Sequence, residues 1–294
     1  MKLYAPAYYK NFTCIADKCE HSCCIGWEID IDADTLEKYE GLNDGYGSVV
    51  KDSISYDGDP HFSLCENDRC PHLNENGLCR IILGVGEDHL CTICREHPRF
   101  YNFTSVAEVG LGMSCREAAR VILSSPLYYI TEEIDKTDAD EIEIEFDGRI
   151  ERQRLYEILR DDRIAYPEKI ANICRDYGVR LSDDSVYLEI IENLEYLDPA
   201  HKDMLLKYSS DRRAVGYDEY LERFFAYLVY RHCTEAFDIE DFSLRLGFCL
   251  VLEGLLASLI RTENASTLDD IATLSSIISE EIEYSDDNTD ALMI

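Results

Sequence analysis

The chain is short of basic residues. It carries 28 lysines and arginines against 60 aspartates and glutamates, which gives a formal net charge of −32 over 294 residues. A surface this acidic repels phosphate backbones, so we expect no nucleic-acid partner. It would attract a lysine-rich or otherwise cationic partner, although acidity of this kind also serves simply to keep a protein soluble.

The sequence also lacks a long apolar run. We find no stretch that approaches the roughly 20 residues a membrane helix needs, and residues 1–13 lack the apolar core of a signal peptide. We therefore expect a cytoplasmic protein without a membrane segment. Disulfides are rare in the cytoplasm, so the 13 cysteines require another explanation, and metal ligation is the usual one.

The cysteines are concentrated at one end of the chain. Ten of them lie between residues 14 and 115, where glycine and proline also cluster, as at residues 41–47 and 58–60. This composition predicts loops and short elements around something other than a large apolar core, with metal ligation supplying folding free energy. The remaining three, Cys174, Cys233 and Cys249, fall on predicted apolar helix faces and should pack in the core.

The rest of the sequence has mostly helical patterns. Asp32 or Asp34 can cap an early helix that ends at Gly41, and Cys115 precedes a second helix. Beyond residue 147, apolar residues at helical spacing predict successive helices. The segments are 149–161, 167–178, 183–197, 217–233, 241–260 and a last helix from Ser266 or Thr267 to about residue 284. We expect 241–260 to be the buried central helix and the tail from residue 285 to be frayed.

An acidic, weakly patterned stretch separates the two halves. Between residues 133 and 146, Ile142, Ile144 and Phe146 alternate with acids, which suggests a short strand or an extended linker. We therefore predict two domains, 1–132 and 147–284. The predicted fold is mainly α, with a cysteine-rich, loop-dominated metal-binding N-terminal module packed on an all-helical C-terminal half.

The cysteine spacing indicates the kind of metal site. Thiolates select zinc, copper(I) or iron–sulfur clusters. Zinc fingers usually have two paired ligand sets, whereas only Cys91 and Cys94 have C-x2-C spacing here. The irregular spacing and the adjacent pair favour a cluster or a multi-metal site. The thiols form three groups: Cys14-x4-Cys19-x3-Cys23-Cys24, then Cys70, Cys79, Cys91 and Cys94, then Cys115.

Other polar residues lie among these thiols. Three histidines do so: His21, His72 and His97. Any of them could be a ligand, but hydrogen bonding to sulfur or plain surface exposure is the more common role. Three arginines flank the same motifs: Arg95, Arg99 and Arg116. They could offset the negative charge of a thiolate site or bind a carboxylate, or they could form ordinary surface ion pairs.

Five ordered motifs over residues 4–125 resemble the flagellin lysine-N-methylase family. That family is itself similar to small cysteine-rich proteins described as zinc- or iron-chelating domains. The motifs are Tyr8-Tyr9-x2-Phe12-x-Cys14; Cys19-x3-Cys23-Cys24-x-Gly26-Trp27-x-Ile29; Cys70-Pro71-x-Leu73-x4-Leu78-Cys79; Cys94-x3-Pro98-Arg99; and Ser114-Cys115-x-Glu117-Ala118-Ala119-Arg120.

The resemblance implies an iron–sulfur protein that uses S-adenosylmethionine to methylate lysines of flagellin or a similar protein. A 4Fe-4S cluster is the expected cofactor, with zinc as the alternative. Eight ligands exceed the four that one cubane needs, so there are two centres or some cysteines support the others. Cys65 and Cys91 fall outside the pattern. The eight residues that match it are Cys14, Cys19, Cys23, Cys24, Cys70, Cys79, Cys94 and Cys115.

The position of a methyl donor is less well indicated. We expect a pocket between the two halves, near Trp27, Arg95, Arg99 and Arg116. The C-x3-C-x2-C triplet of radical S-adenosylmethionine enzymes is absent, because the third position is Gly26. The partial dinucleotide motifs 84–86 and 110–112 are weak signals and are expected to be turns.

The sequence is compatible with three functions. The first is a cluster-containing lysine methyltransferase. The second is a non-catalytic or redox metal-binding protein, and the third is a structural zinc protein whose acidic helical half binds a basic partner. Transfer to lysine needs a neutral amine and a proton acceptor. No base is singled out among 20 tyrosines and 60 acids.

Overall fold

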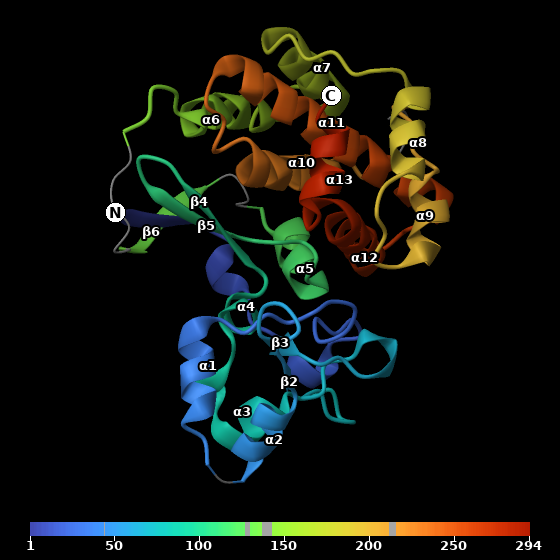
Figure 1. Cartoon of the computed structure of the whole chain (residues 1–294). Coiled ribbons are helices and arrows are strands. Elements are labelled where there is room, and N and C mark those ends of the chain that lie inside the picture. Colours follow the sequence, from blue (N-terminus) through green and yellow to red (C-terminus); the bar gives the residue numbers. More distant parts are fainter. Residues whose placement is uncertain (44, 127–129, 137–142, 212–215) are drawn as a thin grey trace. The chain divides into compact units, whose positions relative to one another are not determined.

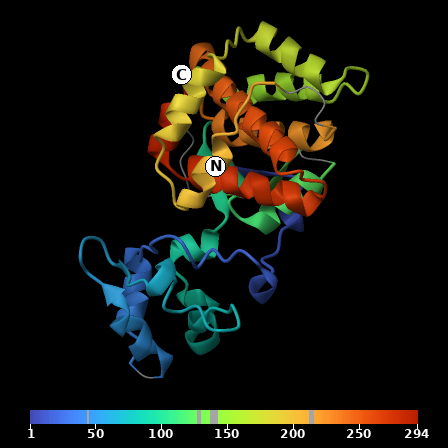
Figure 2. The same ribbon diagram turned by 90° about the vertical axis from the view of Figure 1, so that its right-hand side faces the viewer.

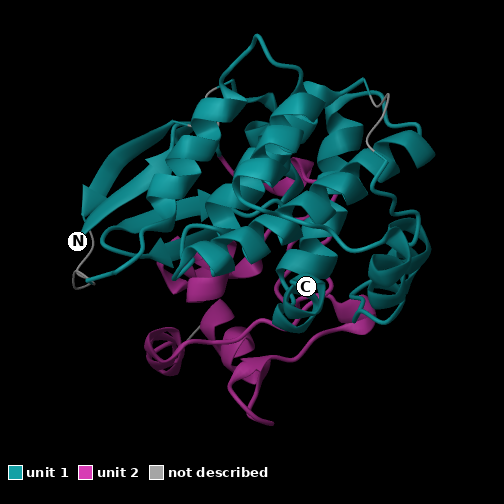
Figure 3. Ribbon diagram, turned by 90° about the horizontal axis from the view of Figure 1, so that it is seen from above, with its two compact units in different colours: residues 1–12, 98–294 teal, residues 13–97 magenta. Residues whose placement is uncertain are grey.

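The computed structural model describes residues 1–43, 45–126, 130–136, 143–211 and 216–294. These residues form two compact units (Figure 3). Unit 1 consists of residues 1–12 and 98–294, and unit 2 consists of residues 13–97. Unit 2 is therefore one continuous segment, inserted in the sequence between the first strand of unit 1 and the remainder of that unit.

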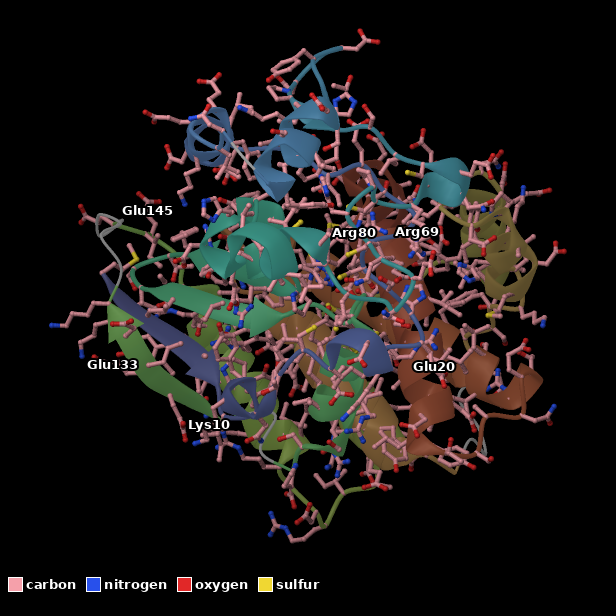
Figure 4. The ribbon with its side chains drawn as sticks, turned by 90° about the horizontal axis from the view of Figure 1, so that it is seen from below. Lys10, Glu20, Arg69, Arg80, Glu133 and Glu145 are labelled. Carbon is pink, nitrogen blue, oxygen red and sulfur yellow. The ribbon has the colours of Figure 1, made fainter. Side chains whose placement is uncertain are left out.

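Unit 1 contains a four-stranded sheet in the order β4-β5-β1-β6. Its strands are β1 (Lys2–Pro6), β4 (Arg99–Phe103), β5 (Ala107–Leu111) and β6 (Thr131–Lys136). β1 pairs in parallel with β5, placing Leu3 opposite Ala107, and antiparallel with β6. An exposed ion pair of 2.8 Å between Lys2 Nζ and Glu133, which Figure 4 labels, joins β1 to β6. These pairings place the N-terminus in unit 1.

The compact units differ from the two predicted domains, 1–132 and 147–284. The chain divides after residue 12 and after residue 97, and the sheet shares a unit with the helices. The reason is strand pairing between residues far apart in sequence, which periodicity cannot reveal. β6 lies at the start of the acidic stretch 133–146. Ile142, part of the alternating pattern, lies outside the described residues.

The helical part of unit 1 is built around α11 (Ile239–Thr262), as predicted. α10 (Asp218–His232), α12 (Leu268–Ile278) and α9 (Pro199–Leu205) pack against it, and α10 and α12 also contact α5 (Arg116–Ser124) (Figures 1 and 2). Cys233 and Cys249 are fully buried in this core with their sulfurs 3.8 Å apart, and Cys174 packs against it. The core role predicted for these three cysteines is confirmed.

One described helix, α11, is long and apolar enough to cross a membrane by length and composition. This differs from the prediction that no apolar run approaches that length. The core helix of a soluble protein passes the same test, and 83% of the most apolar window of α11 is buried inside the protein. A single helix with these properties is therefore weak evidence for a membrane span.

The remaining helices follow local signals in the sequence. Asp32 caps α1 (Ala33–Glu40), Thr267 caps α12 in a capping box, and Gly178 has a φ of +67° after α7. The other helices of unit 1 are α6 (Gly148–Leu159), α7 (Tyr166–Asp176), α8 (Asp184–Glu192) and α13 (Asp286–Leu292). The mainly helical fold is confirmed, including the described part of 147–284.

Several local expectations were wrong. Residues 84–86 are not a turn, because Gly84 and Val85 end the helix Arg80–Val85. The tail from residue 285 is not frayed, because Ser285 caps α13 and Leu292 is buried. Residues 110–111 are not a turn but the end of β5. Gly110 is needed there because a Cβ would come within 2.2 Å of the Phe100 ring on the neighbouring strand.

Unit 2 has short elements and a small core of its own. Its core contains Ile29, Tyr39, Phe62 and Ile81. Its elements are α1, α2 (Tyr46–Asp52), β2 (Ile54–Ser55), β3 (His61–Phe62), α3 (Arg80–Val85) and α4 (Thr92–Glu96), together with 3-10 turns at Ala16–Lys18, Glu66–Asp68 and Glu87–His89. These short elements agree with the loop-rich character predicted for this region.

Candidate metal-binding site

Five thiols share the core of unit 2. Cys70 and Cys91 belong to that core, with 5% and 1% of their surface exposed. Cys24, Cys79 and Cys94 are partly buried and pack against the same core. The sequence intervals between these cysteines reach 46 residues, from Cys24 to Cys70, so tertiary folding is what gathers them.

Backbone hydrogen bonds bring the thiol-bearing segments together. The Cys70 amide donates to the Cys24 carbonyl at 2.8 Å, and isolated bridges pair Ile25 with Arg69 and Leu73 with Cys79. Cys79 and Cys91 are the residues that precede α3 and α4. Hydrogen bonds and helix starts therefore fix the backbone of the segments that carry these thiols.

The surroundings of the thiols shift their pKa values in both directions. A hydrogen bond from Cys23 lowers the pKa of Cys24 to about 7, helped by the cation of Arg69, which Figure 4 labels. Burial raises the pKa of Cys70 to about 12 and also raises that of Cys79, where the backbone amides of Ile81 and Ile82 oppose it. Neighbouring sulfurs add to these shifts, because negative charge on one thiol disfavours it on the next.

Cys91 and Cys94 affect each other's pKa. The hydrogen bond between them lowers the pKa of Cys91, with help from the Tyr39 hydroxyl, and raises the pKa of Cys94. Tyr39 is fully buried, and its hydroxyl oxygen lies 3.5 Å from the Cys91 sulfur. Cys91 falls outside the sequence pattern, yet the structure places it among the gathered thiols.

Other predicted ligands lie elsewhere. Cys14 and Cys23 are exposed, the Cys19 thiol donates to the His21 carbonyl at 2.8 Å, and Cys115 belongs to unit 1. Among the residues the structure describes, no three His, Cys, Asp or Glu side chains stand close enough to hold a metal ion. The donor set is of the soft type that zinc and iron–sulfur clusters use, but the thiols do not converge to ligand distances.

The histidines divide into different roles. Both ring nitrogens of His72 have hydroxyl partners, Tyr46 at 2.8 Å and Ser53 at 2.9 Å, and burial lowers the pKa of His72 to about 4. In this arrangement His72 is a neutral core residue rather than a ligand. The His97 ring packs near Trp27, with centroids 5.9 Å apart.

The four residues predicted for the cofactor fall into different units. Trp27 and Arg95 belong to unit 2, where Trp27 donates to the Cys23 carbonyl and Arg95 contacts Thr92 and Glu96. Arg99 and Arg116 belong to unit 1. Arg99 donates to the Tyr9 hydroxyl at 2.8 Å. That these four residues line one pocket stays a prediction.

A second polar cluster, in unit 1, was not predicted. The Glu283 carboxylate is fully buried and accepts hydrogen bonds from Tyr227 at 2.9 Å and His232 at 2.7 Å, with Arg231 at 3.4 Å. Burial raises the pKa of Glu283, but Arg231 and His232 outweigh it and bring the value to about 2. The carboxylate ends a one-turn π-helix, Ser279–Glu283, and no local sequence signal marks that distortion.

Comparison with known proteins links the chain to a methylase. Over 130 residues it is 28% identical to the flagellar biosynthetic protein FliU of Salmonella muenchen, and equally so to proteins named lysine-N-methylase from Salmonella choleraesuis and Salmonella typhimurium. The chain is a distant relative of these lysine-N-methylases. This confirms the resemblance inferred from the cysteine motifs. No protein-family model and no solved structure matches the chain.

The match is partial on both sides. It covers 41% of this chain and 76% of the FliU protein, but only 32% of each lysine-N-methylase. The chain therefore spans about a third of the lysine-N-methylases it matches.

Proposed function

We propose that this chain is a lysine N-methyltransferase that uses S-adenosylmethionine, carries an iron–sulfur cluster and acts on flagellin or a similar lysine-bearing protein. The observation that carries the proposal is the similarity to two proteins named lysine-N-methylase. The ordered cysteine motifs and the gathered thiols of unit 2 support its metal-binding part.

The proposed reaction is a direct transfer. The neutral lysine amine attacks the methyl carbon of the sulfonium, a carbon–nitrogen bond forms as the carbon–sulfur bond breaks, and the amine loses a proton to a base. The cofactor would fix the fold of unit 2 or bind the methionine part of the donor. The residues proposed to hold it are thiols, whose thiolate forms bind iron or zinc.

The charge of the chain supports a lysine-bearing partner. A net charge of −32 favours encounter with a cationic segment and repels nucleic acid. This attraction weakens as salt screens it, over a distance of about 10 Å at 0.1 M ionic strength. We expect substrate capture to fall with salt more steeply than the metal content does.

Methyl transfer tests the proposal directly. The full chain is reconstituted anaerobically with iron and sulfide and incubated with flagellin and methyl-labelled S-adenosylmethionine, and the hydrolysed flagellin is analysed for N-methyllysine. We expect label in lysine and an equal amount of S-adenosylhomocysteine. Cys79→Ala should lose cluster and activity, whereas Cys174→Ala, which alters a half-buried thiol packed on the helical core, should keep both.

A second function is a metal-binding or redox protein without methyl transfer. The observation that favours it is the enclosure of the gathered thiols within unit 2, combined with the small part of each lysine-N-methylase that the chain spans. The same assay separates the two. A fully clustered protein that leaves its cognate flagellin unlabelled would support this second function and exclude the first.

A further inference from the structure

A groove in unit 1 is lined by α8, α13 and the segment that follows α8. It has a volume of about 510 Å³, and its apolar lining residues are Val186, Ile190, Leu194 and Ala291. Val186 and Ile190 lie about one helical turn apart on α8, and 39% of the Val186 surface is exposed. The groove therefore offers an apolar strip that a partner can cover.

The other side chains in this groove include three carboxylates without a local counter-charge. Glu189, Glu195 and Asp287 line it, and all three are exposed. In the part of the chain that the structure describes, none of the three forms an ion pair. The sequence supplies no nearby cation either, because residues 181–200 and 262–294 contain no lysine, arginine or histidine. The groove is therefore both apolar and strongly negative.

A second groove of unit 1 shows the opposite arrangement. It has a volume of about 490 Å³ and is also lined by apolar side chains, among them Ile239. Here, however, Arg154 lines the groove and forms an ion pair with Glu151, and the Tyr177 hydroxyl donates to the same carboxylate at 3.1 Å. This second groove carries its own cation, whereas the groove at α8 and α13 has none.

The walls of the groove at α8 and α13 are fixed to each other. Asn288 of α13 is 2% exposed, and its side-chain amide donates to the carbonyls of Glu195 and Glu281 at 2.7 and 2.6 Å. Its side-chain oxygen accepts from the Glu195 amide at 2.9 Å. Because these bonds already hold the chain after α8 against α13, a partner would meet a formed groove, which lowers the entropic cost of binding.

We propose that the groove at α8 and α13 is a docking site for a cationic amphipathic helix of a partner protein. The apolar face of that helix covers Val186 and Ile190, and its lysines or arginines face Glu189, Glu195 and Asp287. Charge decides among occupants, because a second copy of this chain, at −32, is repelled, as are nucleic acid and anionic lipid. The inference rests neither on methyl transfer nor on metal binding.

Peptide binding to the full-length chain tests the inference. The probe is a fluorescein-labelled 18-residue peptide of leucine and lysine whose leucines fall on one helical face, and fluorescence anisotropy measures its Kd. The comparison peptide has the same composition in scrambled order, so it keeps the charge and loses the apolar face. We expect saturable binding of the ordered peptide, at least about fivefold weaker binding of the scrambled one, and loss of affinity as salt is added.

Variants of the chain locate the binding. The double variant Glu189→Lys with Asp287→Lys should weaken binding of the ordered peptide at least about fivefold, because two attractive pairs become repulsive. The matched control, Glu157→Lys with Asp162→Lys, makes the same change in net charge at exposed residues outside the groove and should stay within about twofold of the wild type. Val186→Ser keeps the charge, removes apolar contact, and should weaken binding about three- to tenfold.

Hydrogen exchange provides a readout that needs no variant. Bound peptide should slow amide exchange in α8 and α13 and leave α6 unchanged. Circular dichroism shows whether each variant is folded, and if the groove variants unfold, the exchange pattern of the wild type decides.

Four results would overturn the inference. The first is equal weakening by the groove and control double variants, which would mean attraction by net charge alone. The second is equal affinity for the ordered and scrambled peptides. The third is no saturable binding, or slowed exchange only outside α8 and α13. The fourth is a dimer of the chain in sedimentation that Glu189→Lys dissociates, which would place a second copy in the groove.

Discussion

Removing Arg152 should destabilise unit 1 as a whole. Its guanidinium, on α6, donates to both oxygens of Glu108 on β5, at 2.7 and 2.8 Å, with 6% and 3% of the two side chains exposed. It also donates to Thr234 and lies 4.6 Å from the Tyr230 ring centroid. In Arg152→Met the Glu108 carboxylate stays buried without its cation. Breaking a buried pair in this way costs about 3–5 kcal/mol.

Thermal unfolding measures this loss. For a domain of about 150–250 residues, 1 kcal/mol corresponds to about 2–4 °C in Tm, so we expect Arg152→Met to lower the Tm of unit 1 by about 6–20 °C. The double variant Glu108→Gln with Arg152→Met removes both charges and should recover much of the loss. A single variant within about 1 kcal/mol of the wild type would refute the reasoning. So would a sheet that melts separately from the helices, because the pair joins them.

Four further variants test other contacts. Asp32→Ala should cost about 1 kcal/mol as a lost helix cap. Burial raises the pKa of Asp32, but its hydrogen bonds lower the pKa to about 2. In urea titrations, the difference in unfolding free energy between the variant and the wild type should therefore shrink as the pH falls from about 4 to 2. The Glu281 hydrogen bond raises the pKa of His201, so the stabilisation of the fold by protonated His201 is complete below about pH 6.5 and fades above it. His201→Gln should remove this fall in Tm from a plot of Tm against pH. An unchanged fall in Tm would contradict the assignment. Gly148→Ala should cost about 1–3 kcal/mol, because a Cβ would lie 2.4 Å from a carbonyl oxygen; Gly247→Ala, where the nearest atom is 3.6 Å away, should be neutral or gain up to about 1 kcal/mol in the same melts.

Much of the local structure could be predicted from the sequence. The cap at Asp32, the helix stop at Gly178 and the capping box at Thr267 all depend on residues within a turn of one another. The burial of α11 follows from apolar residues on every face. These signals are short-range, so no knowledge of distant neighbours is needed to interpret them.

The candidate site was predicted less completely. The sequence indicates cysteine ligation because thiols are concentrated and irregularly spaced, and the family pattern selects eight of them. It passes over Cys91 and gives Tyr39 no role, because the contact between them joins residues 52 positions apart. It also keeps His72 as a possible ligand, which its two hydroxyl partners argue against.

By itself, the sequence determined where the longer helices lie, that the cysteines are concentrated in residues 14–115, and that the protein is strongly acidic. The tertiary structure decided that β1 pairs with β5 and β6, that unit 2 is an insertion between strands of unit 1, and which thiols share a core. The difference has one physical cause. Periodicity and caps record the interactions of near neighbours, whereas strand pairing and thiol clustering depend on contacts that exist only after the chain has folded.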